Sequence, residues 1–558
     1  MSNIFLKKFS HLATLVIVFT LIIYLPYIIY GGIIYDDWAI FELFFLNLNY
    51  SDVLRDWFFG SHYTRPIGSL YLSSIGFIFK DKIYLYLINN TIIIVLTAIL
   101  FSKSISYKYS LKTAFIFSIL FLSPNLSSTN IFSPIEQSQG NLANLIFSLG
   151  IYFLIKSREN NQNKKYKIYS YLFIMLSLLT YETTIVLIPF FILLNNGFII
   201  NFKNKLQLSN FKILFPIIIF CIIVFLYQTI STQILSHLNL LGGHDVYKFG
   251  FLENEFLSDI FKYSYKPITI MLIDIPSLYL SSILNSFDFK ILLNSILISI
   301  LIIFICSLNI NNNFKNNIES RFNIFLLAFL SYGLLIMIHI VGTSVPDIRG
   351  YNNRYFVSFN VIFSLCISLL IFNLLKFKKY KITIIISIFI FLILHFNTFI
   401  TQRDNFIKVH KVQNEIKKEI MKIDLSEKSI VFANIPTYLV NNFNNETIFS
   451  NEVNDWPRAV RYWTNKKIFS ERIYVDEKCE NILNYKDNYF FSMRSSRSKR
   501  IKNKTSQKLF EKYPEIINLD NFNNFYLFRF IEKEGSKIEK IQFENINNQL
   551  KNMFNCRH

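Results

Sequence analysis

Apolar runs of about 20 residues recur along the first 400 residues of the chain and are separated by short polar loops. A helix of about 20 mostly apolar residues is long enough to cross the hydrocarbon core of a membrane. The sequence therefore predicts an α-helical polytopic membrane protein. We expect about eleven spans, near residues 9–30, 83–102, 112–125, 134–155, 168–180, 184–199, 213–232, 290–308, 322–342, 354–375 and 382–400.

Two parts of this prediction allow another interpretation. Spans 168–180 and 184–199 are divided only by the polar cluster Tyr181-Glu182-Thr183-Thr184, so they could instead form one long tilted helix. The first span follows two lysines, as the apolar part of a signal peptide would. However, it exceeds 20 residues and no small-residue cleavage site precedes Gly31, which favours an uncleaved anchor.

The composition supports a membrane protein and excludes three other classes. Apolar residues make up 52% of the chain and charged residues 17%, against roughly 45–50% and ~25% in soluble domains. Such apolar content excludes a disordered chain. With 5 Cys and 15 Gly, the sequence is neither a disulfide scaffold nor a collagen.

The placement of the basic residues decides what the net charge of +20 means. With the amino terminus in the cytoplasm, nineteen Lys and Arg residues fall in the predicted inner loops, as the positive-inside rule requires. This sorting keeps spans 168–180 and 184–199 separate and places the carboxyl terminus outside. We therefore expect membrane lipids as partners and no nucleic acid. The abundance of Asn, Lys, Ile and Phe suggests an AT-rich genome and favours a bacterial inner membrane with a periplasmic outer face.

The composition changes after residue 400, which divides the chain into a membrane domain and a domain of residues 401–558 outside the membrane. A charged helical stretch, Arg403–Lys422, precedes short β-like runs at Ser429–Asn434, Arg472–Val475 and Phe525–Phe530. These patterns predict a small α/β domain, and about 150 residues are enough to bury a core.

The five cysteines and a basic run after residue 490 do not form a recognisable metal-binding or catalytic motif. Cys479 and Cys556 could pair in an oxidising compartment, whereas Cys221, Cys306 and Cys366 lie in predicted spans as small apolar residues. A basic run follows in the outer domain, and it is either a solvated loop or a contact for lipid phosphates or anionic glycans. Its members are Arg494, Arg497, Lys499, Arg500, Lys502 and Lys504.

The outer loop at residues 31–82 carries two adjacent carboxylates, Asp36 and Asp37. They repel each other, so at least one should need a cation, a metal or a proton. One of them could act as a general base on a hydroxyl group, or both could hold a divalent metal ion that binds a diphosphate. Alternatively, one Asp caps a helix at Trp38–Phe45, and this role is compatible with catalysis by the other.

Further along this loop, His62 and Arg65 could bind phosphate or could be plain surface residues beside the lipid head groups. Pro66 is predicted to start a helix at Ile67–Phe79. About 13 residues are too few to span the membrane, so we expect this helix to lie in the membrane interface. Such a position suits a substrate that arrives from the lipid.

Two more polar groups fall on the same predicted outer face. Glu136 and Gln139 open the span at 134–155, and Glu182 stands between two apolar stretches, where ionisable groups usually face a cavity or a partner. Arg349 and Arg354 precede the span at 354–375, where an arginine can bind a phosphate with two hydrogen bonds or extend along the interface. Their convergence on one face is the main physical argument for a site.

No nucleotide-binding loop precedes a helix on the predicted inner face, so the energy for a reaction should come from a lipid-borne group or a gradient. At these polar residues the sequence resembles the GT-C superfamily of integral-membrane glycosyltransferases, which includes protein O-mannosyltransferases, aminoarabinose transferases and TMTC-type proteins. The resemblance rests on the order of motifs over about the first 200 residues. They are Asp36-Asp37, Arg65-Pro66-Ile67, Leu87-Ile88-Asn89-Asn90, Gln139-Gly140-Asn141-Leu142-Ala143-Asn144-Leu145 and Leu178-Leu179-Thr180-Tyr181-Glu182-Thr183, the last before a stretch with Pro189.

The resemblance implies a catalytic base or metal ligand at Asp36 or Asp37, and a donor phosphate site lined by Glu182 and Arg354. It also implies a polyprenyl-phosphate-linked sugar as donor, an inverting transfer outside the cytoplasm, and a glycan, lipid or protein as acceptor. TMTC-type sequences have Arg at the position of Gln139 and Lys-Glu where this chain has Tyr181-Glu182. The phosphate-binding cation would then come from His62, Arg349 or Arg354.

Two other functions remain open at this point. A polymerase or ligase of surface polysaccharide would also be polytopic, and it would depend on outer residues such as Arg349 and His244. A solute transporter or lipid flippase would place charges near the middle of the membrane, often in two repeated halves. The sequence has no internal repeat, and its acidic residues gather at one surface.

Overall fold

The computed structural model describes most of the membrane part of the chain and parts of the segment after residue 426. The described residues are 2–34, 37–38, 41, 50–51, 54, 65–159, 163–195, 215–216, 218–224, 226–227, 230, 269–284, 287–307, 321–341, 350–375, 380–426, 429–434, 455–465, 469–476, 479–481, 485–486, 489–491, 516–518, 524–533 and 537–545.

Five helices in these residues are long and apolar enough to cross a membrane. They are Phe9–Tyr30 within α1 (Ser2–Tyr30), α5 (Ile83–Lys108), α8 (Ser138–Glu159), Asn353–Leu374 and α18 (Lys381–Met421). The fourth joins the end of the 3-10 helix η5 (Gly350–Phe356) to α17 (Val357–Leu374). The structure therefore agrees with an α-helical membrane protein, while the number of about eleven spans stays a prediction.

Shorter helices complete the described membrane part. They are α4 (Pro66–Phe79), α6 (Leu111–Leu122), α7 (Thr129–Phe132), α9 (Lys164–Thr180), α10 (Ile188–Asn195), α14 (Ile275–Leu284), α15 (Phe289–Ser307) and α16 (Arg321–Val341), with a π-helical turn at Ile270–Asp274 before α14. The alternative of one continuous helix through the polar cluster at 181–184 is wrong. Tyr181 adopts an extended backbone that ends α9, and the 3-10 helix η1 (Glu182–Leu187) leads into α10.

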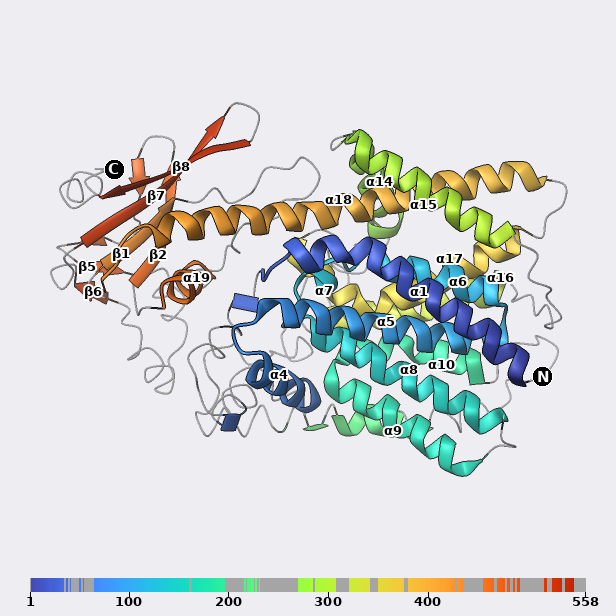
Figure 1. Cartoon of the computed structure of the whole chain (residues 1–558). Coiled ribbons are helices and arrows are strands. Elements are labelled where there is room, and N and C mark those ends of the chain that lie inside the picture. The colour runs from blue at the N-terminus through green and yellow to red at the C-terminus, as the bar shows by residue number, and fades with distance from the viewer. Residues whose placement is uncertain are drawn as a thin grey trace.

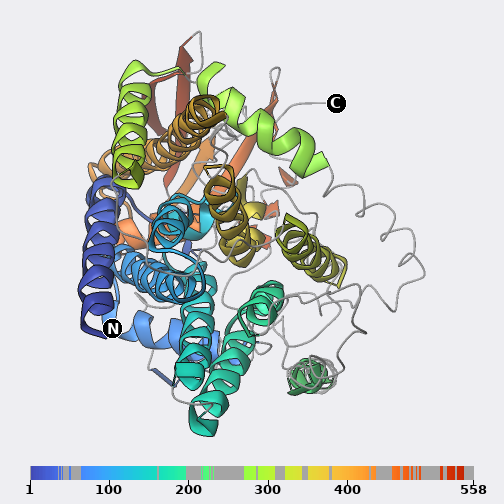
Figure 2. The same cartoon turned by 90° about the vertical axis from the view of Figure 1, so that its right-hand side faces the viewer.

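Small residues let neighbouring helices approach closely, as is common in membrane bundles. Helices α8 and α9 lie side by side in both views (Figures 1 and 2). A Cβ atom added to Gly150 of α8 would lie 2.9 Å from a side-chain carbon of Ile174 and 3.0 Å from the carbonyl oxygen of Ser170. Only glycine therefore fits at this contact with α9 without a shift of one helix.

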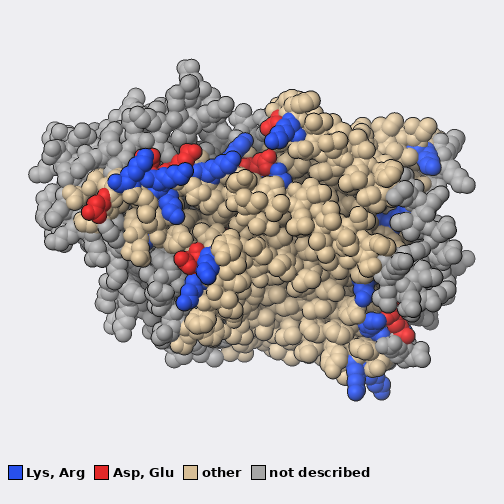
Figure 3. Space-filling model, viewed as in Figure 1, with Lys and Arg blue, Asp and Glu red and all other residues tan. Residues whose placement is uncertain are grey.

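The outer surface of the bundle is apolar where lipid would cover it. Figure 3 shows a broad band without described charges between two groups of charged side chains, one toward α18 and one at the far ends of the helices. Large apolar side chains on α1 and α5 are 37–58% exposed in this region. They include Ile22, Leu25, Ile29, Tyr84, Ile88 and Ile92.

Helix α18 connects the bundle to the sheet (Figure 1). The sequence predicts a span at 382–400 and a separate charged helix at Arg403–Lys422, but the structure joins them in one helix of 41 residues. At 1.5 Å per residue this helix is about 60 Å long, roughly twice the hydrocarbon thickness of a membrane. Its second half therefore extends beyond the bundle. Near the middle of α18, Arg403 Nη1 donates a hydrogen bond to the carbonyl of Ile23 in α1 at 3.1 Å.

Strands after α18 form two sheets, and the segments 429–434, 472–475 and 525–530 predicted as β-like all lie in strands. The five-stranded sheet has the order β3-β2-β1-β7-β8, with β1 parallel to both β2 and β7. In chain order the strands are β1 (Ser429–Asn434), β2 (Phe469–Asp476), β3 (Cys479–Asn481), β4 (Tyr485–Lys486), β5 (Tyr489–Phe491), β6 (Ile516–Asn518), β7 (Asn524–Lys533) and β8 (Lys537–Asn545). Strands β4, β5 and β6 form the smaller sheet.

An apolar cluster joins this region to the membrane bundle. Helix α19 (Asp455–Thr464), between β1 and β2, buries Trp456 and Trp463 against the end of α18. The Trp463 ring lies 5.8 Å from the ring of Trp38, edge to face, and Trp38 follows the predicted Asp pair. The sheet region therefore packs directly on the first outer loop.

Candidate functional site

Arg65 stands immediately before α4, which begins at Pro66 as the sequence predicts. Proline is favoured at the first helical position because the missing N–H has no helical partner there. The 14 residues of α4 make it shorter than a membrane span. Pro66 thus fixes where the backbone enters the helix, and Arg65 is placed at its amino-terminal end.

The Arg65 guanidinium forms a two-point ion pair with Glu182. Its Nε donates a hydrogen bond to Glu182 Oε2 at 2.7 Å, and its Nη2 donates to Oε1. The guanidinium carbon also lies 4.3 Å from the centre of the Tyr181 ring. Arg65 is buried, but the Glu182 side chain remains 35% exposed, so the pair is reachable from outside.

Gln139 reaches the same place from the start of α8. A Cβ atom added to Gly68 of α4 would lie 2.7 Å from Gln139 Oε1 and 2.9 Å from the carbonyl oxygen of Thr180. This contact brings α4, α8 and the end of α9 together within one turn of Arg65. Gly68 is therefore required for the approach that places Arg65 beside Glu182.

Arg354 approaches from η5. Its charge acts on both Tyr181 and Glu182, in the same direction as that of Arg65. Arg354 Nη2 donates a hydrogen bond to Tyr355 at 3.1 Å, and Asn130 holds the Arg354 backbone carbonyl at 2.9 Å. Four predicted site residues, Arg65, Gln139, Glu182 and Arg354, thus come from four separate parts of the chain to one place.

Asp37 is fully buried and ties the first outer loop to the segment before α8. Its Oδ1 accepts hydrogen bonds from Ser133 Oγ at 2.8 Å and from the backbone N–H groups of Glu136 at 2.9 Å and Ile135 at 3.2 Å. Its Oδ2 accepts one from the N–H of Ile34 at 3.4 Å. Burial raises the pKa of the Asp37 carboxyl to about 7, against the opposing effect of these hydrogen bonds.

A network of side-chain amides connects α5, α7 and α8. No role for these side chains was predicted from the sequence. Asn141 Nδ2 donates to Asn90 Oδ1 at 2.9 Å, and both side chains donate to the carbonyl of Asn130. Asn144, three residues on, accepts a hydrogen bond from Ser358 of α17 at 2.9 Å. The spacing of Asn141 and Asn144 in an apolar helix could have indicated one polar face turned to its neighbours.

Several predicted residues lie outside the described part of the chain. They are Asp36, His62, Arg349 and His244, together with the basic run at 494–504 and Cys556. The helix predicted at Trp38–Phe45 lies mostly outside it as well. The described Glu136 contributes a backbone N–H to Asp37.

The described residues contain no group of three or more His, Cys, Asp or Glu side chains that could hold a metal ion. Asp37 itself is a poor metal ligand because Oδ1 already accepts three hydrogen bonds from the protein. Asp36 lies outside the described part of the chain. The described geometry thus supports a cluster of two arginines and an amide around one carboxylate, and the excess positive charge could receive a phosphate.

The sequence was also compared with known proteins. No model of a known protein family matches it, and no curated protein is significantly similar to it. The chemistry of the site therefore has to be argued from its own residues.

Proposed function

We propose that this protein is a membrane glycosyltransferase, which moves a sugar from a polyprenyl-phosphate carrier to a glycan, lipid or protein acceptor outside the cytoplasm. The observation that carries the proposal is the meeting of Arg65, Gln139, Glu182 and Arg354 at one place beside the buried Asp37 loop. Two cations and an amide at the mouth of an apolar bundle suit a substrate with a phosphate head and a lipid tail.

The arginines would bind the phosphate that leaves during transfer. Arg65 is already oriented by Glu182 and by the Tyr181 ring, so little ordering is needed when a ligand binds. Cations held in place before the reaction stabilise developing negative charge better than mobile ones. Arg354, steadied through its backbone and Tyr355, would supply the second cation.

The two aspartates divide the work in this proposal. A general base must reach the acceptor hydroxyl, which a fully enclosed carboxyl cannot do. Asp37 is therefore assigned as the positioning residue that fixes the loop, and Asp36 as the base. The acceptor oxygen attacks the anomeric carbon, its proton passes to the Asp36 carboxylate, and the bond from that carbon to the phosphate oxygen breaks with the electron pair leaving on the phosphate.

The remaining assignments follow from the topology that the sequence predicts. The site would face the periplasm of a bacterial inner membrane, with the amino terminus in the cytoplasm. The segment 401–558 would form a domain on the same side, where it could dock the acceptor. Trp463 of this segment contacts Trp38, the residue after Asp37, and this contact supports a position of the domain beside the site.

The proposal is tested on the lipid-linked glycans of membranes that contain the protein. Mass spectrometry should show a product that disappears in the variants Asp36→Asn and Asp36→Asn/Asp37→Asn, although the protein still reaches the membrane. Glu159→Gln is the matched control, because Glu159 pairs with Lys156 at the opposite end of α8. Transfer that survives in the double variant would refute the assignment.

One observation favours a transporter as a second candidate. His395 of α18 lies buried among Ser123, Asn125 and Tyr279, with hydrogen bonds of 2.8, 3.0 and 3.0 Å. Ionisable residues inside a membrane span often line a transport path. Uptake or lipid flipping by the purified protein in vesicles, without formation of a glycosidic bond, would establish this function instead.

A further inference from the structure

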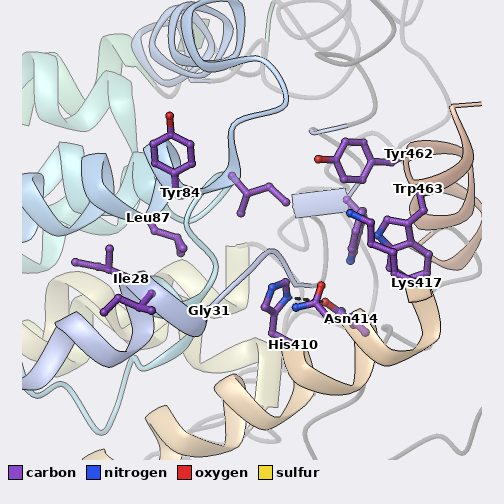
Figure 4. A pocket seen from close by; sticks show the side chains of 13 residues that line it. Ile28, Gly31, Tyr84, Leu87, His410, Asn414, Lys417, Tyr462 and Trp463 are labelled. Atoms are coloured by element: carbon purple, nitrogen blue, oxygen red, sulfur yellow. Dashed lines mark hydrogen bonds between the residues drawn. The ribbon is translucent and has the colours of Figure 1, made fainter. Parts of the chain in front are cut away.

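A cavity of about 220 Å³ lies between the bundle and the sheet region, and its described lining includes neither Arg65 nor Glu182. It is enclosed by the end of α1, the start of α5, the extension of α18 and helix α19 (Figure 4). The candidate membrane span of α1 ends at this cavity, and that of α5 begins there. We therefore expect the cavity to lie at the level where lipid head groups begin.

The two walls of this cavity differ in chemistry. Ile28, Ile29 and Leu87 form an apolar wall on α1 and α5. His410, Asn414 and Lys417 project from α18 on the opposite side, together with Tyr462 of α19; Figure 4 shows the two groups facing each other. The described residues that line the cavity include no carboxylate.

Lys417 is the cation of the polar wall. Its Nζ lies 5.8 Å from the centre of the Tyr462 ring, and the described residues offer it no carboxylate in an ion pair. The side chain is half-buried, whereas its neighbour Lys418 is exposed. Lys417 is therefore held toward the cavity, and it carries a positive charge that an anion would neutralise.

The apolar wall continues into the exposed surface of the bundle. Leu25 and Ile29 on α1 and Ile88 and Ile92 on α5 are 37–58% exposed along the same pair of helices. Lipid chains cover such a surface in a membrane. Tyr84 is 54% exposed at the mouth, at the depth where tyrosines gather in membrane proteins.

We propose that this cavity binds one anionic glycerophospholipid of the outer leaflet. The phosphate lies against Lys417, the glycerol and ester oxygens meet Asn414 and Tyr462, and one acyl chain follows the apolar surface of α1 and α5. The combination of an apolar track, a single half-buried cation and neutral hydrogen-bonding groups matches this lipid class. This site is separate from the one proposed for sugar transfer and does not depend on that function.

The bound lipid would fasten the first outer loop. The His410 ring packs directly on the backbone at Gly32, because a Cβ atom added there would lie only 1.9 Å from His410 Nδ1. Trp38, the neighbour of Asp37, also lines the cavity. A lipid in this place would therefore stabilise the contact between the loop, α18 and α19.

The test uses the full chain in detergent, with native mass spectrometry to count bound phosphatidylglycerol, phosphatidylcholine or undecaprenyl phosphate. We expect phosphatidylglycerol to bind about tenfold more weakly to Lys417→Glu than to the unchanged protein, and Lys417→Arg to retain binding. Lys418→Glu is the matched control, since it makes the same change of charge one residue away outside the cavity. Thermal unfolding of each variant without lipid shows that it is folded.

Three outcomes would overturn the proposal. Equal weakening in Lys418→Glu would show general attraction between a basic helix and an anionic lipid. Equal binding of phosphatidylcholine would show that Lys417 does not select the charge. Preferential binding of undecaprenyl phosphate would assign the cavity to the isoprenoid carrier.

Discussion

Arg65 and Glu182 are 117 residues apart in the sequence, and their side chains meet through two hydrogen bonds. The pair joins the start of α4 to the break between α9 and α10, with the Tyr181 ring beneath the guanidinium. It is a structural tie and also the centre of the proposed phosphate site. These two roles make different predictions for the same substitutions.

Exchanging the partners separates the two roles. Arg65→Ala should lower the free energy of unfolding by about 1–3 kcal/mol, because Glu182 loses its charged partner, with the lower end favoured by the 35% exposure of Glu182. The double variant Arg65→Glu/Glu182→Arg should recover much of this stability. It should not recover sugar transfer if Arg65 has to face the phosphate. Thermal unfolding in detergent and mass analysis of the product measure the two effects.

A swapped variant that regains both stability and transfer would show that the pair is only a structural tie. Lys156→Ala provides a comparison for stability, since Lys156 forms its ion pair with Glu159 of the same helix, at the end of α8 away from the site.

The stability of the protein should depend on the ionisation of Asp37. Its pKa is raised to about 7 in the folded protein, so the protonated carboxyl is favoured on folding. This stabilisation is complete below the ordinary pKa near 4 and is lost as the pH rises through about 7. The unchanged protein should therefore lose more thermal stability between pH 4 and pH 8 than Asp37→Asn, which cannot ionise.

Parallel stability profiles of the unchanged protein and Asp37→Asn over this pH range would contradict that prediction. Asp37→Ala should be less stable than Asp37→Asn at every pH, because alanine leaves the N–H groups of Ile135 and Glu136 without their acceptor.

Local patterns predicted much of what the structure shows. Hydropathy placed the apolar helices, Pro66 marked the start of α4, and the β-like run Ser429–Asn434 coincides with β1. The sequence also placed Arg65, Gln139, Glu182 and Arg354 on one predicted face, but it could not show which would touch. That outcome depends on long-range packing, such as the approach of α4 to α8 at Gly68.

The roles of the two aspartates could not be separated from the sequence for a related reason. Adjacent residues on a loop can face opposite ways, and the burial of Asp37 depends on N–H groups about 100 residues further along the chain. Nor did the charged run after residue 400 reveal that α18 continues without a break, because helix propensity carries no mark of a membrane boundary.

The close contact at Gly68 can be tested against a glycine with open space. Gly68→Ala should lower the free energy of unfolding by about 1–3 kcal/mol, because the new Cβ would meet Gln139 Oε1 and the Thr180 carbonyl. It should also reduce sugar transfer by displacing Arg65. Gly333→Ala in α16 is the control, since nothing lies within 4 Å of its added Cβ. That change should be neutral or stabilising by up to ~1 kcal/mol, and a similar loss in both variants would contradict the role of Gly68.

The buried His395 cluster makes the last prediction, which also distinguishes a structural role from transport. Ser123 Oγ donates to the carbonyl of Ile119 at 2.8 Å, so it accepts a hydrogen bond from His395 Nε2, and Nδ1 accepts those of Tyr279 and Asn125. His395→Leu should therefore cost about 3 kcal/mol or more, because several buried groups lose a partner. A double-mutant cycle with Ser123→Ala, measured by thermal unfolding, should give a coupling of about 1 kcal/mol or more. Additive losses would show that the two residues do not interact, and unchanged stability with lost uptake in vesicles would favour transport.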